Sequence, residues 1–249
     1  DGGGQTVAIL FDTRALALEE SGHFWLSPTP EEPGSTGGDA WGLAGVPRMV
    51  TWVRLSFVEG EGELYVYNTH LPANETGGAR ARRLATLLLA ERIAKRARSD
   101  VPFLLLGDLN ATEDEFPLRY LEREVPGCEG AGCPEPPAFS PVAVVDTWRA
   151  ANSGTQGTRC GVSEDGTVVL HGARVDYVLA GDPTVGDPSA APISAPEVLA
   201  SAIALESDGC ASDHVPVVSR IVLPHPRATS SASARDPRAV ARGKGAPAR

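Results

Sequence analysis

The sequence predicts an α/β fold in which two β-sheets pack face to face with helices on the outside. Val101–Leu106 is an apolar run after a helical segment, which is typical of a buried strand, whereas Met49–Phe57 alternates between two faces. In addition, four short polar segments follow predicted core strands, and their spacing places them at one end of such a fold. We expect one domain over residues 1–223 and a tail over residues 224–249.

The N-terminal half is predicted to be rich in strands. Gln5–Phe11 has the composition of a buried strand, and residues 27–47, which are rich in Pro and Gly, predict a long irregular loop. Met49–Phe57 and Glu63–Asn68 flank a Gly-Glu-Gly turn, which predicts an antiparallel hairpin.

Residues Ala79–Arg98 form the clearest predicted helix. At about 100° per residue its apolar side chains fall on one arc. The members of this arc are Ala81, Leu84, Leu87, Leu88 and Ala94. The flanking residues are basic, namely Arg80, Arg82, Arg83, Arg92, Lys95, Arg96 and Arg98. A basic face of this kind is compatible with nucleic-acid binding, but a solvated helix surface is the preferred interpretation.

The C-terminal half alternates strands with irregular segments. Glu115–Glu124 predicts a short helix, and residues 125–141 and 182–196 predict loops because they are rich in Pro or Gly. Residues 224–249 have almost no large apolar side chain and predict a disordered basic tail. Further strands are predicted at Val142–Asp146, Arg174–Leu179 and His214–Val222.

Composition and charge exclude several classes of protein. The chain is 42% hydrophobic and 22% charged, which excludes wholesale disorder, and no apolar run approaches the roughly 20 residues that span a bilayer. The formal net charge is −10; the tail contributes +5, so the remaining residues carry −15. Such a body repels polyanions, which argues against tight non-specific duplex binding. A phosphate substrate stays compatible, because a bound divalent cation would dominate the field in a small cleft.

The four cysteines leave two interpretations open. Cys128 and Cys133 lie in a Pro/Gly-rich loop without a second close pair or neighbouring His residues, which argues against structural zinc. Either this pair closes a short disulfide loop, which would indicate an oxidising, secreted or lumenal compartment, or all four are ordinary thiols. Cys160 and Cys210 are the other candidate pair, beside the segment that ends at His214.

Four segments place polar side chains at the ends of predicted core strands. They are Asn68-Thr69-His70-Leu71, Gly107-Asp108-Leu109-Asn110, Arg174-Val175-Asp176-Tyr177 and Ser212-Asp213-His214. Each segment alone has an ordinary structural explanation, such as a polar group at a strand end or a turn cap. Their joint occurrence is different, because an open sheet gathers its functional groups at strand ends.

Together these segments contain the groups that metal-assisted phosphoester hydrolysis needs. The carboxylates of Asp108 and Asp213 and the amide oxygen of Asn110 suit a hard cation such as Mg²⁺. The imidazoles of His70 and His214 can donate to phosphate oxygens, and a carboxylate can deprotonate an attacking water. Acyl transfer fits poorly, because no Ser or Cys lies in a nucleophile elbow.

In this order and spacing, the four segments resemble the endonuclease/exonuclease/phosphatase superfamily. That superfamily includes pancreatic-type deoxyribonucleases, apurinic endonucleases, deadenylases, neutral sphingomyelinases and inositol-polyphosphate phosphatases. The upstream residues Phe24–Pro30, Pro47-Arg48 and Thr51-Trp52 resemble a branch of mostly bacterial members, so the resemblance covers about residues 5–223. It implies a four-layered α/β sandwich and a phosphodiesterase or phosphatase that depends on Mg²⁺ or Mn²⁺.

The resemblance also implies a role for each matching residue. His70 would contact the scissile phosphate, Asp108 would orient or deprotonate the attacking water, and Asn110 would hold phosphate and water in place. Asp176 would pair with His214, which would stabilise the charged transition state. The implied metal ligands are Asp213, Asp108 and Asn110.

Three further residues are weaker candidates. Arg48 is a candidate substrate-binding residue and Trp25 a candidate for the pocket wall, although each has an equally good structural explanation. His171 precedes Gly172 near the third segment; a loop histidine is the preferred interpretation, and an accessory catalytic group is the alternative.

One feature of the superfamily has no counterpart in this chain. Its members carry an Asn on the first strand and a metal-binding Glu at the end of the next core strand, both before the point that resembles Asp1. The Glu residues before position 60 are all expected in loops or turns, and they are Glu19, Glu20, Glu31, Glu32 and Glu59. The resemblance therefore implies a domain without its first strands and without one metal ligand, and hence with impaired activity.

Three functions follow from these observations. The preferred function is metal-dependent hydrolysis of a phosphodiester or phosphomonoester, such as a small phosphoester or a phospholipid, and the acidic body favours a small or locally contacted substrate. The alternative within enzymes is a nuclease acting on RNA or DNA. The alternative of another class is a non-catalytic binding protein that retains the fold. The intact set Asp108, Asn110, Asp213 and His214 argues against that alternative, whereas the missing Glu argues for it.

Overall fold

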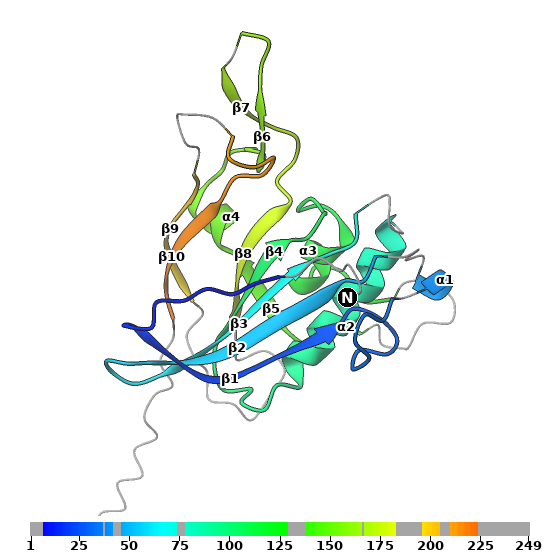
Figure 1. The fold of residues 1–249 in the computed structure, drawn as a ribbon, viewed down its shortest axis with the longest axis vertical. Helices are drawn as coiled ribbons and strands as arrows, with labels where there is room; N and C mark the ends of the chain where they lie inside the picture. The colour runs from blue at the N-terminus through cyan, green and yellow to red at the C-terminus, as the bar shows by residue number, and fades with distance from the viewer. Residues whose placement is uncertain are drawn as a thin grey trace, which may run out of the picture.

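The computed structural model describes residues 7–36, 38–41, 46–73, 78–128, 138–165, 167–182, 196–204 and 210–223. Its main element is a mixed six-stranded sheet with the order β1-β2-β3-β4-β8-β5 (Figure 1). These strands are β1 (Leu16–Trp25), β2 (Met49–Phe57), β3 (Glu63–His70), β4 (Phe103–Asp108), β8 (Asp176–Asp182) and β5 (Ala143–Asp146). With the helices that accompany it, this sheet confirms the predicted α/β class.

Helices and two smaller sheets complete the described part of the chain. The helices are α1 (Gly38–Trp41), α2 (Gly78–Ala94), α3 (Phe116–Leu121) and α4 (Thr147–Ala151). The two-stranded sheets pair β6 (Arg159–Val162) with β7 (Val168–His171) and β9 (Glu197–Ile203) with β10 (Val217–Val222). None of the helices in the described residues is long and apolar enough to cross a bilayer.

The pairing of β3 with β4 sets the direction of the functional strand ends. β2 and β3 form the predicted antiparallel hairpin, with Val50 opposite Thr69. β3 then connects through α2 to β4, which runs parallel to it, and β8 is antiparallel to β4. The end of β3, the end of β4 and the start of β8 therefore lie at one edge of the sheet.

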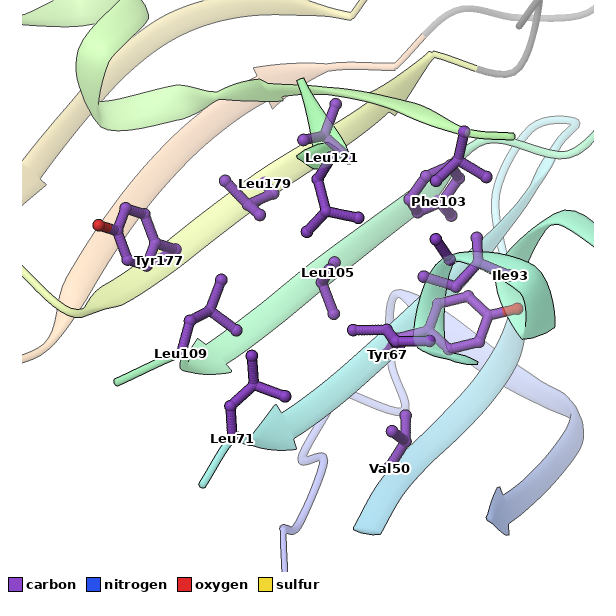
Figure 2. Close-up of a cluster of buried hydrophobic side chains, with 14 of the residues drawn as sticks. Val50, Tyr67, Leu71, Ile93, Phe103, Leu105, Leu109, Leu121, Tyr177 and Leu179 are labelled. Carbon is purple, nitrogen blue, oxygen red and sulfur yellow. The ribbon is translucent and has the colours of Figure 1, made fainter. Parts of the chain in front are cut away.

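The main core lies between this sheet and the helices α2 and α3. Large apolar side chains from β3, β4 and β8 point to the same side and meet the helices, as Figure 2 shows for Tyr67, Leu105 and Leu179. A second apolar cluster consists of Val53, Leu55, Leu64 and Val66, which alternate along β2 and β3 with residues of the first cluster. Because both faces of these strands are apolar, the α/β class is strongly determined by local sequence.

The buried stripe of α2 differs from the predicted arc. The fully buried apolar residues are Ala81, Ala85, Leu89, Ala90 and Ile93, whereas Leu84, Leu87, Leu88 and Ala94 are only half-buried. The alanines let the helix backbone approach the sheet closely, and the larger leucines lie to the side. The predicted basic flank is also partly wrong, because Arg82 is buried and donates to the Pro72 carbonyl and the Glu115 carboxylate.

The N-terminal prediction was wrong in two places. Within the predicted strand Gln5–Phe11, residues 7–11 contain no strand, and Leu10 is 95% exposed. The first strand is instead β1, which contains Glu19 and Glu20, two residues expected in loops or turns. β1 lies at the edge of the sheet and its residues are mostly exposed, so its sequence lacks the apolar alternation that reveals a buried strand.

Several short elements were not predicted, namely α1, α4, β6, β7 and β9. Each has four to seven residues, too few for a clear period. The last strand was predicted to begin at His214, but β10 begins at Val217, so His214 lies before the strand. The predicted disordered tail 224–249, and Cys133 of the predicted Cys128–Cys133 pair, lie outside the described residues.

Candidate active site

Strand register brings three of the candidate residues together. His70 is the last residue of β3, Asp108 the last of β4 and Asp176 the first of β8. His70 pairs with Asp108 and Asp108 pairs with Asp176 across the sheet. Side chains of residues directly opposite each other lie on the same face, so these three form a continuous row.

Gly107 makes the close approach of β3 and β4 possible at this point. Its φ is +135°, and a Cβ on it would lie 1.8 Å from the Thr69 carbonyl oxygen. No other residue fits there without moving the strand. The glycine of the second polar segment is therefore part of the site's framework.

A turn after β4 orients the Asp108 carboxylate. The Asn110 backbone N–H donates to Asp108 Oδ1 at 2.8 Å, and the Asn110 side chain donates through Nδ2 to the Leu71 carbonyl at 2.9 Å. Asn110 has a φ of +47°, a left-handed conformation that Asn tolerates better than most residues. Asn110 thus connects the ends of β3 and β4 and fixes the carboxylate between them.

The segment that carries His214 is held against β6. Cys160 N–H donates to the Asp213 carbonyl at 2.9 Å, and Val215 N–H donates to the Thr158 carbonyl at 2.9 Å. A disulfide joins Cys160 to Cys210, which confirms this candidate pair. The hydrogen bonds and the disulfide together place the His214 side chain beside the row on the sheet.

Four side chains form the resulting cluster. His214 Nδ1 lies 2.7 Å from Asp176 Oδ2, as expected from the resemblance, and His70 Nε2 lies 3.3 Å from Asp108 Oδ2. Ligand atoms of Asp108, Asp176 and His214 all lie within 4.8 Å of one another. The four side chains are between 16% and 28% exposed, so the cluster is sheltered but reachable.

Burial and neighbouring charges decide the protonation of this cluster. Burial and, to a smaller extent, the cationic Arg48 lower the pKa of His70 to about 4, which outweighs the opposing effect of Asp176. His70 is therefore neutral near pH 7 and has one N–H to donate. Burial raises the pKa of Asp108, against the hydrogen bond from the Asn110 backbone. A carboxylate with a raised pKa is a better proton acceptor than an ordinary aspartate.

The other candidates occupy different positions. Arg48 is buried, and its effect on His70 places it near the cluster. Asp213 is exposed, accepts a hydrogen bond from the Ser212 hydroxyl at 3.2 Å, and is not part of the close group of ligand atoms. Trp25 ends β1 opposite Met49, and His171 is an exposed residue at the end of β7.

Two functional contributions were missed by sequence reasoning. The fully buried Thr158 hydroxyl accepts hydrogen bonds from the backbone N–H groups of Val175, at 3.1 Å, and Asp176, at 3.3 Å. Arg174, in the third polar segment, is buried and pairs with Asp146 at 2.5 Å and Glu113 at 2.9 Å. Nothing in the local sequence distinguishes Thr158, whereas the buried acid Asp146 has a pattern typical of an N-cap before α4.

The donor set of the cluster fits a hard divalent cation. Asp108 and Asp176 contribute carboxylate oxygens, which Mg²⁺ and Mn²⁺ prefer, whereas Nδ1 of the neighbouring His214 is already engaged with Asp176 Oδ2. Asp176, expected only to pair with His214, therefore also lies beside Asp108, and the metal-ligand role expected for Asp213 stays a prediction.

Comparison with known proteins gives a consistent result. The model of the family described as "Endonuclease/Exonuclease/phosphatase family" matches residues 7–214. No curated protein matches the sequence closely enough to count as a relative.

Among solved structures, a functionally unknown conserved protein from Enterococcus faecalis has a TM-score of 0.62 at 20% identity. An endonuclease/exonuclease/phosphatase from Bacteroides vulgatus has a TM-score of 0.60 at 19% identity. The mannosyl-6-phosphatase Bt3783 of Bacteroides thetaiotaomicron has a TM-score of 0.55 at 21% identity. The alignments cover 86% of this chain and 69%, 68% and 69% of those chains, and at these identities they show a shared fold alone.

Proposed function

Because the chain belongs to the endonuclease/exonuclease/phosphatase family, we propose that it is a divalent-metal-dependent phosphoester hydrolase. The observation that carries this proposal is the cluster of His70, Asp108, Asp176 and His214 at one edge of the sheet. Two imidazoles and two carboxylates within reach of one phosphate are what in-line attack by water requires.

The roles follow from the contacts. Asp176 accepts the Nδ1–H of His214, so the imidazole turns its Nε2 side towards the site. When the ring carries both protons, as imidazolium, Nε2–H donates to a phosphate oxygen. Neutral His70 supplies a second donor without adding a positive charge. Asp108 accepts the proton of the attacking water, and the Asn110 backbone keeps its carboxylate in place.

A bound divalent metal would neutralise the negative charge that develops on the phosphoryl oxygens. Asp108 and Asp176 would hold it through their carboxylates. Arg48 adds a fixed positive charge beside His70, so the site favours an anionic substrate even though the chain as a whole is acidic.

The acidic charge of the whole chain favours a small phosphoester over a long nucleic acid. The similarity in fold to a mannosyl-6-phosphatase is compatible with a small phosphomonoester. A nuclease remains the alternative enzyme, and a diester and a monoester probe distinguish these reactions.

The test is hydrolysis of bis-p-nitrophenyl phosphate and p-nitrophenyl phosphate by the purified protein, with Mg²⁺, with Mn²⁺ and with EDTA. We expect turnover that requires the cation and is lost in His214→Ala. His23→Ala is the matched control, because His23 lies on the edge strand β1, away from the cluster.

Turnover equal in His214→Ala and in the parent protein would place the chemistry elsewhere. No turnover with either ester, together with no binding of Mn²⁺ measured by electron paramagnetic resonance, would favour a non-catalytic binding protein.

A further inference from the structure

A cavity lies away from the catalytic cluster, between β1, β2, β3 and the last two turns of α2. Its volume is about 550 Å³, which is within the range of small-molecule sites. Tyr65 lines it and precedes His70 by five residues on β3, which is roughly 16 Å along a strand. Tyr65 and His70 also point to opposite faces of the sheet, so the cavity is separate from the proposed active site.

The floor of this cavity is aromatic. The ring centroids of Trp52 and Tyr65 are 6.0 Å apart, and those of Tyr65 and Tyr67 are 6.1 Å apart and stacked. Tyr65 and Tyr67 are almost fully buried, whereas Trp52 is half-buried and gives the floor its accessible ring. The accessible face of the Trp52 indole is flat and apolar, which suits it to another flat ring.

Gly22 allows Trp52 to lie in this position. The two residues pair across β1 and β2, and a Cβ on Gly22 would lie 2.7 Å from Cζ2 of the indole. The indole therefore rests against the backbone of β1. Any larger residue at position 22 would displace the ring.

The rim of the cavity carries balanced charges. Arg92 pairs with Glu31 at 2.6 Å, and Lys95 pairs with Glu91. Arg96 donates to backbone carbonyls, including that of Ile93 at 2.9 Å. Glu20, on β1, lines the side of the cavity that faces α2. Three cations and three carboxylates therefore surround an aromatic floor, which gives donors and acceptors but little net charge.

We propose that this cavity binds a planar, uncharged heteroaromatic molecule of the nucleobase or nucleoside class, stacked on Trp52. Stacking on an aromatic side chain accepts any flat heterocycle, and the alternating donors and acceptors at its edge match the paired charges of the rim. Because the charges of the rim balance, the cavity has no net positive charge to attract a phosphate, which distinguishes it from the catalytic cluster. The binding site is independent of the proposed hydrolase function.

The test uses adenosine as the probe, with binding measured by saturation-transfer NMR and titration calorimetry on the purified protein. We expect saturable binding in the parent protein and a loss of about tenfold or more in affinity in Gly22→Ala, whose methyl group displaces Trp52. Ser21→Ala is the matched control on the same strand, because Ser21 is exposed and alternates to the other face. Lys95→Ala is a second variant for the case that Gly22→Ala does not fold, because Lys95 is exposed on the rim and its loss should not affect folding. We expect Lys95→Ala to weaken adenosine binding measurably.

Four results would overturn the proposal. The first is no saturable binding of adenosine at concentrations on the order of 1 mM. The second is unchanged affinity in a folded Gly22→Ala protein, or in Lys95→Ala if that variant alone is folded. The third is loss of adenosine binding in His214→Ala, which would place the probe in the catalytic cluster. Methyl glucoside binding in place of adenosine would likewise contradict the heteroaromatic class.

Discussion

His214 and Asp176 are 38 residues apart in the sequence, yet His214 Nδ1 lies 2.7 Å from Asp176 Oδ2. An imidazole that donates to a transition state needs one nitrogen towards the phosphate and the other on a fixed acceptor. Asp176 is suited to be that acceptor because its backbone is fixed by the Thr158 hydroxyl at the start of β8. The two residues are therefore expected to act as one unit.

In His214→Ala we expect kcat to fall by about 10²–10³, the usual effect of losing one transition-state donor. At saturating Mg²⁺, which keeps any loss of metal affinity out of kcat, Asp176→Asn should lose part of this factor, and the double variant should be no worse than His214→Ala, because the pair acts together. Steady-state kinetics of the three variants with bis-p-nitrophenyl phosphate checks this. Losses that multiply in the double variant would contradict the shared role.

Thr158 is expected to be a positioning residue for this pair. Its hydroxyl accepts from the N–H groups of Val175 and Asp176, and its carbonyl accepts from Val215 next to His214. Thr158→Val keeps the shape but removes the hydroxyl, so we expect kcat to fall about 10- to 100-fold with KM little changed. Thr158→Ser should restore kcat. An equal fall in Thr158→Val and Thr158→Ser would mean that packing, and not the hydroxyl, matters.

At the scale of single elements, the C-terminal end of α3 carries a carboxyl group in an unfavourable place. Burial and, to a smaller extent, the nearby Asp146, Glu124 and Glu113 raise the pKa of Glu122 to about 7, against the effect of Arg174. The end of a helix also disfavours negative charge. The folded protein therefore keeps this proton at pH values where an unfolded chain has lost it.

This shift predicts a pH dependence of stability. Between the ordinary value of 4.5 and about 7 the folded state binds more protons at Glu122, so the free energy of unfolding falls as pH rises through this window. Glu122→Gln removes the effect, so its Tm should exceed that of the parent protein at pH 8 and approach it at pH 4. Glu164→Gln, in the exposed turn between β6 and β7, is the control. A constant difference in Tm at all pH values would contradict the shift.

The disulfide between Cys160 and Cys210 joins β6 to the segment that carries His214. It spans 50 residues, and closing a loop of that length in the unfolded chain corresponds to about 4 kcal/mol in the chain-entropy view. We expect reduction to lower both Tm and kcat, because the same hydrogen-bonded segment places His214. In the double variant Cys160→Ala/Cys210→Ala, a reductant should have no further effect on kcat. A parent protein whose kcat is unaffected by reductant would show that the hydrogen bonds to β6 suffice.

At the scale of the whole molecule, net charge predicts how salt affects substrates of different size. The chain carries a formal charge of −10, so a long polyanion is repelled beyond the immediate site. Added salt screens this repulsion, and kcat/KM for a single-stranded oligonucleotide should rise with ionic strength, whereas that for p-nitrophenyl phosphate should change little. The comparison is made between about 20 and 200 mM NaCl at constant Mg²⁺. A fall for the oligonucleotide would indicate a basic binding surface.

The local sequence was sufficient for those parts of the fold whose pattern is strong. The β2–β3 hairpin, β4 and α3 were predicted because turn residues and apolar runs mark them directly. β1 was missed because an exposed edge strand has no apolar alternation, and the buried stripe of α2 was misplaced because several alternatives on a Leu- and Ala-rich helix look alike. The strand expected at Gln5–Phe11 was wrong for residues 7–11, which pack against the second apolar cluster through Ile9 and Phe11 but form no backbone ladder with a described strand.

By itself, the sequence determined the α/β class and the chemical types at the candidate site, because the polar segments at strand ends are local features. Only the tertiary structure decided which of these groups meet: register aligned His70, Asp108 and Asp176, and contacts with β6 brought His214 to them but left Asp213 exposed. It also decided that Trp52 packs against Gly22 and lines the floor of the cavity between β1, β2, β3 and α2. The physical reason is that pairing between strands and packing between elements join residues far apart in the chain, and no local period records those distances.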